Sequence, residues 1–393
     1  MTGTAHDEAP SGDMAEGTTA GLLARGAVIA TATVFGLSYS LAAPLMALAL
    51  TRRGLDETLV GLNAAMHAAG VLIAAPLLPR LAARFAPRAL ALVALLVTAA
   101  VLAILPFVPW IWMWFALRLL LGMAAETLFV LSETWTNQMS TEATRARAMA
   151  TYTACLSLGF AGGPLVLSVV GDGGITAWWI GAALALGAST LLAAPGIPAG
   201  AFHAGSGRGL LRFLRLAPLA LAGTALNAAV EAAGLSFLPL YAISLGWGEA
   251  EATRLVSTLL VGAILMQPVI GWLGDRMDRG RLVLILAATA GVTALAWPFL
   301  LGIGWLAYAA LFLWGGVFVG IYTLLLAIVG SRFQGADLVG IYATMGLAWG
   351  GGALAGPLLT GAAADVTAHG LPIVTALLCL LYAGFVLRLR RSA

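Results

Sequence analysis

The chain is a succession of apolar stretches of about twenty residues separated by short polar segments, and this pattern limits the fold more than any other feature. Hydrophobic residues make up 61% of the 393 residues and charged residues only 9%, whereas soluble domains carry roughly 25% charged residues. About twenty apolar residues form one helix across a bilayer core, where a helix satisfies its own backbone hydrogen bonds. We therefore predict an all-α integral membrane protein in contact with the lipid bilayer.

Twelve apolar stretches can be placed along the chain in two sets of six. They lie at about 26–50, 59–79, 89–108, 110–132, 146–170 and 176–194, and at about 216–244, 252–273, 281–301, 303–329, 337–363 and 370–387. We predict twelve transmembrane helices in two six-helix bundles, at 26–194 and 216–388. The other segments are predicted to be cytoplasmic: a disordered N-terminal tail at 1–25 without a signal peptide, an inter-bundle loop at 195–215, and a C-terminal tail at 389–393.

The arginines predict the orientation of the chain. All twenty basic residues are arginines. If the N-terminus is cytoplasmic, sixteen of them fall in cytoplasmic segments, three (Arg52, Arg53 and Arg254) fall outside, and Arg118 lies within a span. Membrane proteins concentrate basic residues on the cytoplasmic side. We therefore expect a multi-pass protein of the bacterial cytoplasmic (inner) membrane with both termini in the cytoplasm.

The polar stretch from Gly271 to Arg281 carries a recognisable motif. Its sequence, Gly-Trp-Leu-Gly-Asp-Arg-Met-Asp-Arg-Gly-Arg, suits a tight hydrated turn with local charge pairing between two membrane helices. The pattern resembles the signature loop of the major facilitator superfamily (MFS). The resemblance implies the MFS fold, a parallel 6+6 repeat of two bundles that work by alternating access. It also implies that Asp275 acts as a latch, meeting a helix N-terminus or an arginine of the adjacent bundle.

A weaker copy of this region occurs earlier in the chain, and it indicates that the two halves of the chain are a tandem duplication. Four matched pairs are each separated by 192 positions, namely Gly54 and Gly246, Gly70 and Gly262, Pro76 and Pro268, and Arg84 and Arg276. Ala83 stands where the later copy has Asp275, so the first signature loop is degenerate. Two further elements, Gly159–Pro164 and Gly352–Pro357, match at a separation of 193 positions, and their small residues would let helices approach closely.

A gate is predicted where the signature loops lie. Glu133 belongs to Ser-Glu-Thr-Trp-Thr-Asn at 132–137 and is followed by Arg145 and Arg147, which resembles the YcaD-type branch of the superfamily. We assign the gate to residues of these loops and of this motif. They are Gly271, Asp275, Arg276, Arg279, Gly280, Arg281, Arg84, Glu133, Arg145 and Arg147.

Ionisable side chains inside apolar spans are costly and therefore mark candidate sites. Arg118-Leu-Leu-Leu-Gly122 resembles the Arg-x-x-x-Gly motif that the superfamily links to proton coupling. Glu126 lies near the middle of the same span, and Glu231 lies near the middle of the seventh. We predict that these groups carry protons, with sodium as the alternative ion. The competing interpretation is a set of buried ion pairs or hydrogen bonds that only fix helix packing.

Polar partners accompany these residues at helical spacing. Asn227 precedes Glu231 by four positions, and Asn63 precedes His67 by four, so each pair shares a helix face. A histidine at such a place could shuttle protons or could simply pack. We include Asn227, Asn63 and His67 in the predicted coupling site. Aromatic walls of the cavity are predicted at Tyr39, Phe237, Tyr322 and Trp349.

The most consistent function is secondary active transport, coupled to protons, of a small amphipathic or weakly cationic organic molecule, with export favoured. A polyanion would require several arginines in the cavity. The alternatives are an uptake symporter for a small nutrient, and a non-transporting protein of this fold that acts as a sensor or assembly factor.

Other classes of function lack their signatures in the sequence. The four histidines are scattered, which argues against an enzyme. No Walker motif is present, which argues against a nucleotide-driven pump. We expect no cofactor, no metal and no nucleic-acid partner, and the family resemblance implies a monomer.

Overall fold

The computed structural model describes residues 11–139, 142–171, 174–195, 215–333 and 335–392, and these ranges are mostly helical. Residues 1–10 of the tail expected at 1–25 lie outside the described residues, as does the inter-bundle loop expected at 195–215 apart from its two end residues. The prediction of an all-α membrane protein is confirmed.

Each predicted span corresponds to a helix or to a pair of consecutive helices. The first half contains α1 (Ser11–Arg52), α2 (Glu57–Ala82), α3 (Pro87–Ile104) with the short η1 (Leu105–Phe107), α4 (Ile111–Gln138), α5 (Glu142–Val170) and α6 (Thr176–Ala193). The second half contains α8 (Pro218–Ser244), α9 (Glu249–Leu265), α10 (Gln267–Arg276), α11 (Arg279–Leu295), α12 (Trp297–Leu300), α13 (Gly304–Arg332), α14 (Gly335–Val366) and α15 (Gly370–Ser392).

Within the described residues, ten helical stretches are long and apolar enough to cross a membrane. The pair α11–α12 and the helix α14 occupy the two remaining predicted spans. Proline explains the breaks inside spans, because it lacks an amide hydrogen and clashes with the preceding turn. Pro268 lies at the start of α10 and Pro298 at the start of α12, directly after the breaks.

The N-terminal tail predicted to be disordered at 1–25 is helical from Ser11 onward, and the C-terminal tail predicted at 389–393 is helical up to Ser392. Helix α1 begins at Ser11, whereas its apolar part begins at Gly26. Helix α15 continues to Ser392 through the expected C-terminal tail. A helix that is already formed in the membrane extends at little cost into water, since nucleation is the unfavourable step.

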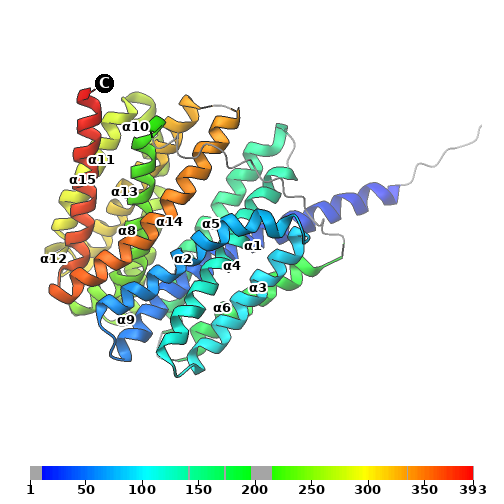
Figure 1. Ribbon diagram of the computed structural model, residues 1–393, viewed down its shortest axis with the longest axis horizontal. Coiled ribbons are helices and arrows are strands. Elements are labelled where there is room, and N and C mark those ends of the chain that lie inside the picture. Colours follow the sequence, from blue (N-terminus) through cyan, green and yellow to red (C-terminus); the bar gives the residue numbers. More distant parts are fainter. Residues whose placement is uncertain (1–10, 140–141, 172–173, 196–214, 334, 393) are drawn as a thin grey trace, which may run out of the picture.

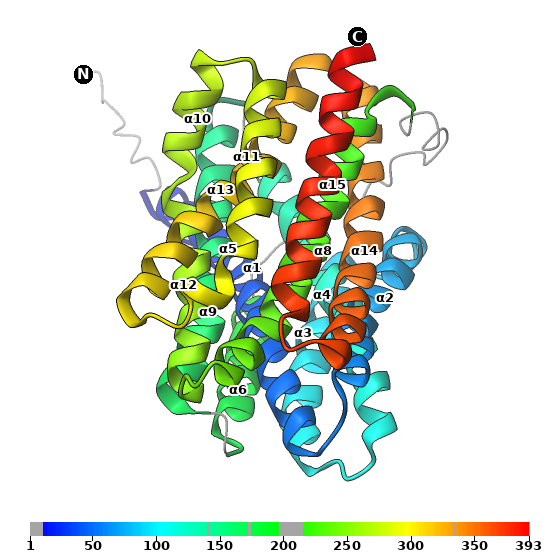
Figure 2. The same cartoon turned by 90° about the vertical axis from the view of Figure 1, so that its left-hand side faces the viewer.

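The packing inside each bundle repeats, which agrees with the predicted duplication. In the first bundle α1 packs against α5, α2 against α4, and α3 against α6. In the second bundle the equivalent pairs are α8 with α14, α9 with α13, and α11 with α15. Figures 1 and 2 show α11 and α15 side by side in the second bundle.

Glycines at matched positions have the same structural role in the two halves. Gly54 and Gly246, in the turns after α1 and α8, adopt φ angles of 80° and 95°, in the left-handed region that favours glycine. A Cβ on Gly159 would overlap the carbonyl oxygen of Thr33, and one on Gly352 would overlap that of Ala225. These two positions let α5 approach α1 and α14 approach α8, as the sequence predicted.

The two bundles meet at one end of the molecule, here called the closed end, which carries Arg52, Glu249 and Asp365. Across the interface α14 packs along α2, α5 along α9, and α1 along α8. Arg52 forms an ion pair with Glu249 of the other bundle. At the opposite, arginine-rich end, which carries the C-terminus and the 276–281 turn, the helices of the two bundles diverge (Figure 1).

Asp365, in the last turn of α14, forms the second polar link at the closed end. Its carboxylate accepts hydrogen bonds from the backbone N–H groups of Glu57 at 2.8 Å and Thr58 at 3.1 Å, and from the Thr58 hydroxyl. These N–H groups belong to the first turn of α2, where a helix lacks internal partners. The second bundle therefore caps a helix of the first.

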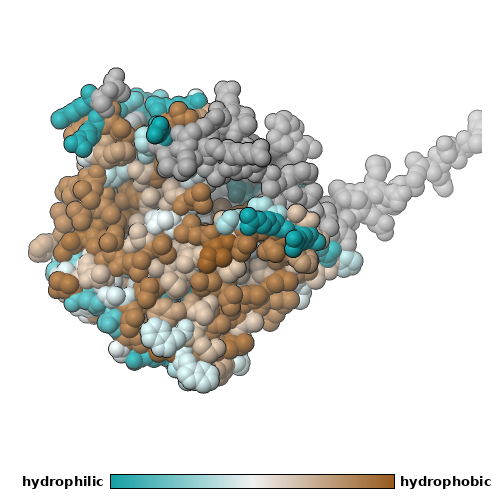
Figure 3. Space-filling model, in the orientation of Figure 1, coloured by the Kyte–Doolittle hydropathy of each residue, from teal (hydrophilic) through white to brown (hydrophobic). Residues whose placement is uncertain are grey.

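The outer surface is suited to lipid. Hydrophobic side chains cover most of the face shown in Figure 3, and hydrophilic ones lie at its upper and lower edges and in a band right of centre. Large apolar residues are exposed along the helices, for example Val169, Phe299 and Leu381. Exposed apolar surface of this extent marks contact with a membrane or a partner.

Candidate functional site

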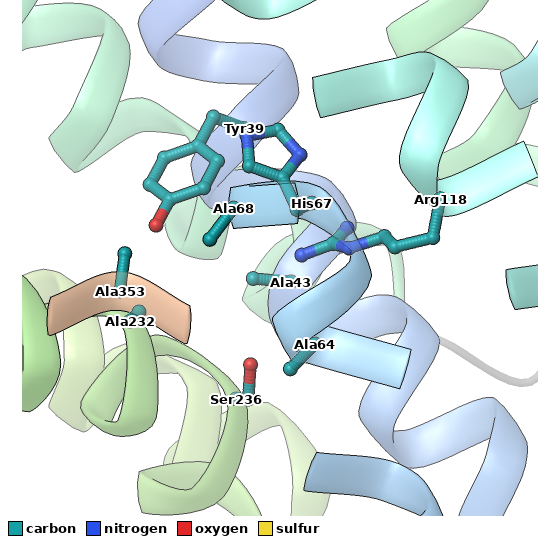
Figure 4. A pocket seen from close by; sticks show the side chains of 9 residues that line it. All are labelled: Tyr39, Ala43, Ala64, His67, Ala68, Arg118, Ala232, Ser236 and Ala353. Carbon is teal, nitrogen blue, oxygen red and sulfur yellow. The ribbon is translucent and has the colours of Figure 1, made fainter. Parts of the chain in front are cut away.

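A small cavity lies between the two bundles, and residues of both bundles line it (Figure 4). Helices α1, α2 and α4 contribute one side, and α8 and α14 contribute the other. The lining residues are Tyr39, Ala43, Ala64, His67, Ala68, Arg118, Ala232, Ser236 and Ala353. The space is about 10 Å³ for the centre of a water molecule, which is room for about one water.

Arg118 on α4 is the single cationic residue of the cavity lining. It is 2% exposed, and its guanidinium group lies 3.3 Å from the sulfur atom of Met46 on α1. Its Nε atom is buried and has no hydrogen-bond partner among the described residues. The expected intramembrane arginine is therefore buried, and the described residues show no ion pair with it.

His67 and Tyr39 form the aromatic side of the cavity. Their ring centroids are 4.6 Å apart, and Figure 4 shows the His67 ring next to the Tyr39 ring, with the Arg118 guanidinium group on the other side of His67. His67 is 5% exposed, and its Nδ1 atom has no hydrogen-bond partner in the described part of the chain. Asn63, one turn earlier on α2, is 1% exposed and its side-chain nitrogen is likewise unpartnered among these residues.

Glu231 lies on α8, on the other bundle. The side-chain nitrogen of Asn227 donates to its carboxylate at 3.3 Å, as the four-residue spacing predicted. Tyr39 lies within electrostatic range of both Glu231 on the second bundle and Arg118 on the first. Glu231 and Arg118 thus both interact electrostatically with the Tyr39 side chain.

Two more acidic residues, Glu126 and Glu133, lie further along α4 toward the arginine-rich end. Both are half-buried, and they lie within electrostatic range of each other. Tyr322 on α13 is within range of Glu133 and of Glu231. Tyr322 is therefore linked electrostatically to Glu231 and Glu133, and Glu133 to Glu126.

Three of the four predicted aromatic residues lie at or near the cavity or these carboxylates. Tyr39 lines the cavity, and Tyr322 lies close to two of the carboxylates. Trp349 packs against Ala68, Ala232 and Ala353 of the cavity wall. Phe237 is different: it is 2% exposed within the hydrophobic core and does not line the cavity.

The predicted gate residues of the second signature loop interact mainly with residues of that loop and of the helices beside it. The carboxylate of Asp275 lies 3.7 Å from the guanidinium group of Arg279, which also donates to the carbonyl oxygens of Gly274 and Ala327 at 3.4 Å. Arg276 stacks on the ring of Trp272, at 3.9 Å from its centroid. In this conformation Asp275 pairs within its own loop, so its role as a latch between bundles stays a prediction.

The remaining gate residues lie around this loop. Gly271 and Gly280 are half-buried, and Arg281 and Arg84 are exposed. The side chains of Arg145 and Arg147 are outside the described part of the structure.

Sequence reasoning missed an ion pair at this end. Asp278 caps α11 by accepting a hydrogen bond from the Arg281 backbone at 2.8 Å, and it forms an ion pair with Arg390 of α15. The Arg390 hydrogen bond, followed by the Arg281 N–H, holds the pKa of Asp278 below its usual range. The sequence does show a second acidic residue in the signature loop, Asp278. Its partner Arg390, however, lies 112 positions further along the chain.

The fold and the cavity define a polytopic membrane transporter in which two repeated bundles enclose a central site. A family model described as Major Facilitator Superfamily matches residues 28–357 and 220–393. The chain belongs to this superfamily and is a membrane transporter rather than an enzyme.

Individual relatives agree with this assignment. An uncharacterized MFS-type transporter, YfkF of Bacillus subtilis (strain 168), is 24% identical over 271 residues, which cover 66% of this chain and 68% of that protein. The comparisons do not test the narrower resemblance to the YcaD-type branch, which stays a prediction.

Solved structures show the same fold. A mutant of the nucleoside transporter NupG is similar with a TM-score of 0.79 and 14% identity, covering 94% of this chain and 99% of that one. A D-xylose-proton symporter is similar with a TM-score of 0.73 and 14% identity, covering 93% and 97%. At these identities the likeness concerns the fold.

Proposed function

We propose that this transporter is coupled to protons and exports a small amphipathic organic molecule across the bacterial cytoplasmic membrane. The observation that carries the proposal is the placement of Glu231 and Arg118 on opposite bundles with Tyr39 near both. Intramembrane acids and bases that face a bundle interior mark proton and ion pathways. Because the two groups belong to different bundles, their separation changes whenever the bundles rock.

In this proposal Glu231 is the group that carries the proton. Asn227 orients its carboxylate through the 3.3 Å hydrogen bond. Glu126, Glu133 and Tyr322 provide a polar route from Glu231 toward the arginine-rich end. Arg118 and His67 belong to the binding cavity. A change in their surroundings would also change the electrostatic environment of Tyr39. Sodium is the alternative ion for the same carboxylates.

The orientation of the chain and the lining of the cavity support the topology and the substrate class that we propose. The positive-inside rule places the arginine-rich end and both termini in the cytoplasm, so the closed end is external. The cavity lining is mostly alanine, with one arginine, one histidine and two hydroxyl groups. Such a lining suits a molecule that is apolar over most of its surface and polar at one end. One chain supplies both sides of the cavity, so we propose a monomer.

Uptake of a small nutrient is the second candidate. The Tyr39 and Ser236 hydroxyl groups and the His67 ring line the cavity and could bind a hydroxylated molecule. Two of the similar solved structures are described as a nucleoside transporter and a D-xylose-proton symporter, which supports this alternative.

The test uses proteoliposomes that contain the full chain and a pH-sensitive dye. A panel of amphipathic compounds is added one at a time, with and without a sodium gradient. A transported compound is expected to move protons and change the dye signal, and Glu231→Gln is expected to lose this signal. Glu251→Gln is the matched control, since Glu251 is an exposed carboxylate in the first turn of α9. A transport signal that follows sodium and ignores pH would contradict proton coupling.

A further inference from the structure

We propose that the cavity around Arg118 binds a compact monovalent anionic group, either the carboxylate of the transported molecule or a free halide ion. This inference rests on the proposed transport function and deepens it by naming the chemistry of the group that binds. The unpaired arginine and the composition of the cavity lining carry the argument.

Arg118 lacks a counter-charge in this conformation. It is 2% exposed, and the neighbour that its guanidinium group contacts within the described residues is the uncharged sulfur of Met46. Removing a charge from water is costly unless an opposite charge or several hydrogen bonds compensate it. A guanidinium group presents five N–H donors and no acceptor, and it matches a carboxylate in geometry. The missing partner is therefore an acceptor with negative charge.

The other polar groups of the cavity are also capable of donating. The Tyr39 and Ser236 hydroxyl groups and the His67 ring can each donate a hydrogen bond, and no carboxylate is among the nine lining residues. The Nδ1 atom of His67 is buried without a partner in the described structure. Figure 4 shows the Arg118 guanidinium group, the His67 ring and the Ser236 hydroxyl on different sides of the cavity. An anion would neutralise the arginine and accept from these donors together.

The dimensions favour a small group over a polyanion. The space of about 10 Å³ accepts about one water-sized particle, such as a halide ion or one end of a carboxylate. The alanines Ala43, Ala64, Ala232 and Ala353 leave no side chain to fill this space, and they would contact the apolar part of a longer molecule. Glu231 is not among the nine lining residues.

The experiment measures the melting temperature of the detergent-purified full chain, because a ligand of the folded state raises it. The probes are benzoate and octanoate, their neutral amides benzamide and octanamide, and sodium chloride compared with sodium sulfate at equal ionic strength. We expect at least one carboxylate or chloride to raise the melting temperature and the matched amides to have little effect. A shift with carboxylates alone assigns the site to the substrate, and a shift with chloride alone assigns it to a free halide.

Variants locate the site. Arg118→Gln is expected to weaken binding of the effective anion about 30-fold, which corresponds to about 2 kcal/mol at 1.4 kcal/mol per tenfold change. Ala232→Val, which narrows the cavity and leaves Arg118 in place, is expected to weaken it as well and serves if Arg118→Gln does not fold. Arg254→Gln is the control, because Arg254 is exposed on α9 and carries the same charge. Glu231→Gln should still bind the anion.

Two results would overturn the inference. One is that no anion raises the melting temperature of the wild type, and the other is that Arg118→Gln and Ala232→Val bind the anion as tightly as the wild type does. Either result leaves proton coupling untouched, because that proposal is tested by proton movement and by Glu231. Conversely, loss of proton movement with intact anion binding would contradict the coupling proposal alone.

Discussion

Removing the carboxylate of Asp365 should open the closed end. Asp365 accepts hydrogen bonds from two N–H groups in the first turn of α2, at 2.8 and 3.1 Å, and it belongs to the other bundle. These bonds exist only while the bundles touch at this end. Losing a capping residue costs about 1 kcal/mol. Asp365→Ala should therefore shift the equilibrium toward conformations that are open at this end by a factor of about five.

The assay is the distribution of distances between two spin labels at the closed end, one on each bundle. Suitable positions are the exposed Trp110 and Glu251, each replaced by cysteine after Cys155 and Cys379 have been changed to alanine. Asp365→Ala should increase the population of the longer distance.

Asp56→Ala is the matched control for this prediction. Asp56 caps the same helix by accepting a hydrogen bond from the Leu59 N–H at 2.8 Å, but it lies in the same bundle as its partner. Its loss should lower stability without changing the distances. If both variants give the distribution of the parent, or if Asp56→Ala shifts it as much as Asp365→Ala does, the reasoning about a cap across the interface is wrong.

Two further predictions concern stability. Arg390 holds the pKa of Asp278 below its usual range. Their ion pair therefore stabilises the fold at pH values above the unfolded-state pKa of Asp278, which is about 3.9. This stabilisation is lost as the pH falls through the lower pKa that Asp278 has in the folded state. Arg390→Gln should thus lower the melting temperature at neutral pH and lose that effect in acid; an equal loss at every pH would contradict this. Gly352→Val should destabilise the chain by about 1 to 3 kcal/mol through its clash with α8, whereas Gly351→Val, with open space around it, should not; similar denaturation midpoints for both would refute the packing argument.

The fold could largely be predicted from one sequence, because the bilayer imposes a length and a composition on each span. The pairs Gly54 with Gly246 and Gly159 with Gly352 also identified positions where both halves need glycine for the same physical reason. The ends of α1 and α15 could not be predicted in this way. Both extend into polar sequence, where the apolar rule gives no information.

The candidate site was only partly predictable. Intramembrane charge identified Arg118 and Glu231, and Tyr39 was predicted as an aromatic wall. That Tyr39 lies within electrostatic range of both groups follows only from the arrangement of three helices. Phe237, predicted as an aromatic wall, does not line the cavity in this conformation. It follows Ser236, which lines the cavity, and consecutive residues leave a helix about 100° apart. The alanines of the cavity wall carry no signal in a chain so rich in alanine.

The most direct test of proton coupling through Glu231 compares two transport modes in proteoliposomes with a compound identified by its proton movement. One mode is exchange of labelled for unlabelled compound at equal pH, and the other is accumulation driven by a pH gradient. Glu231→Gln resembles a permanently protonated side chain, so we predict that it retains exchange and loses accumulation. If Glu231→Gln still accumulates the compound against its gradient as the wild type does, Glu231 is not the residue that carries the proton.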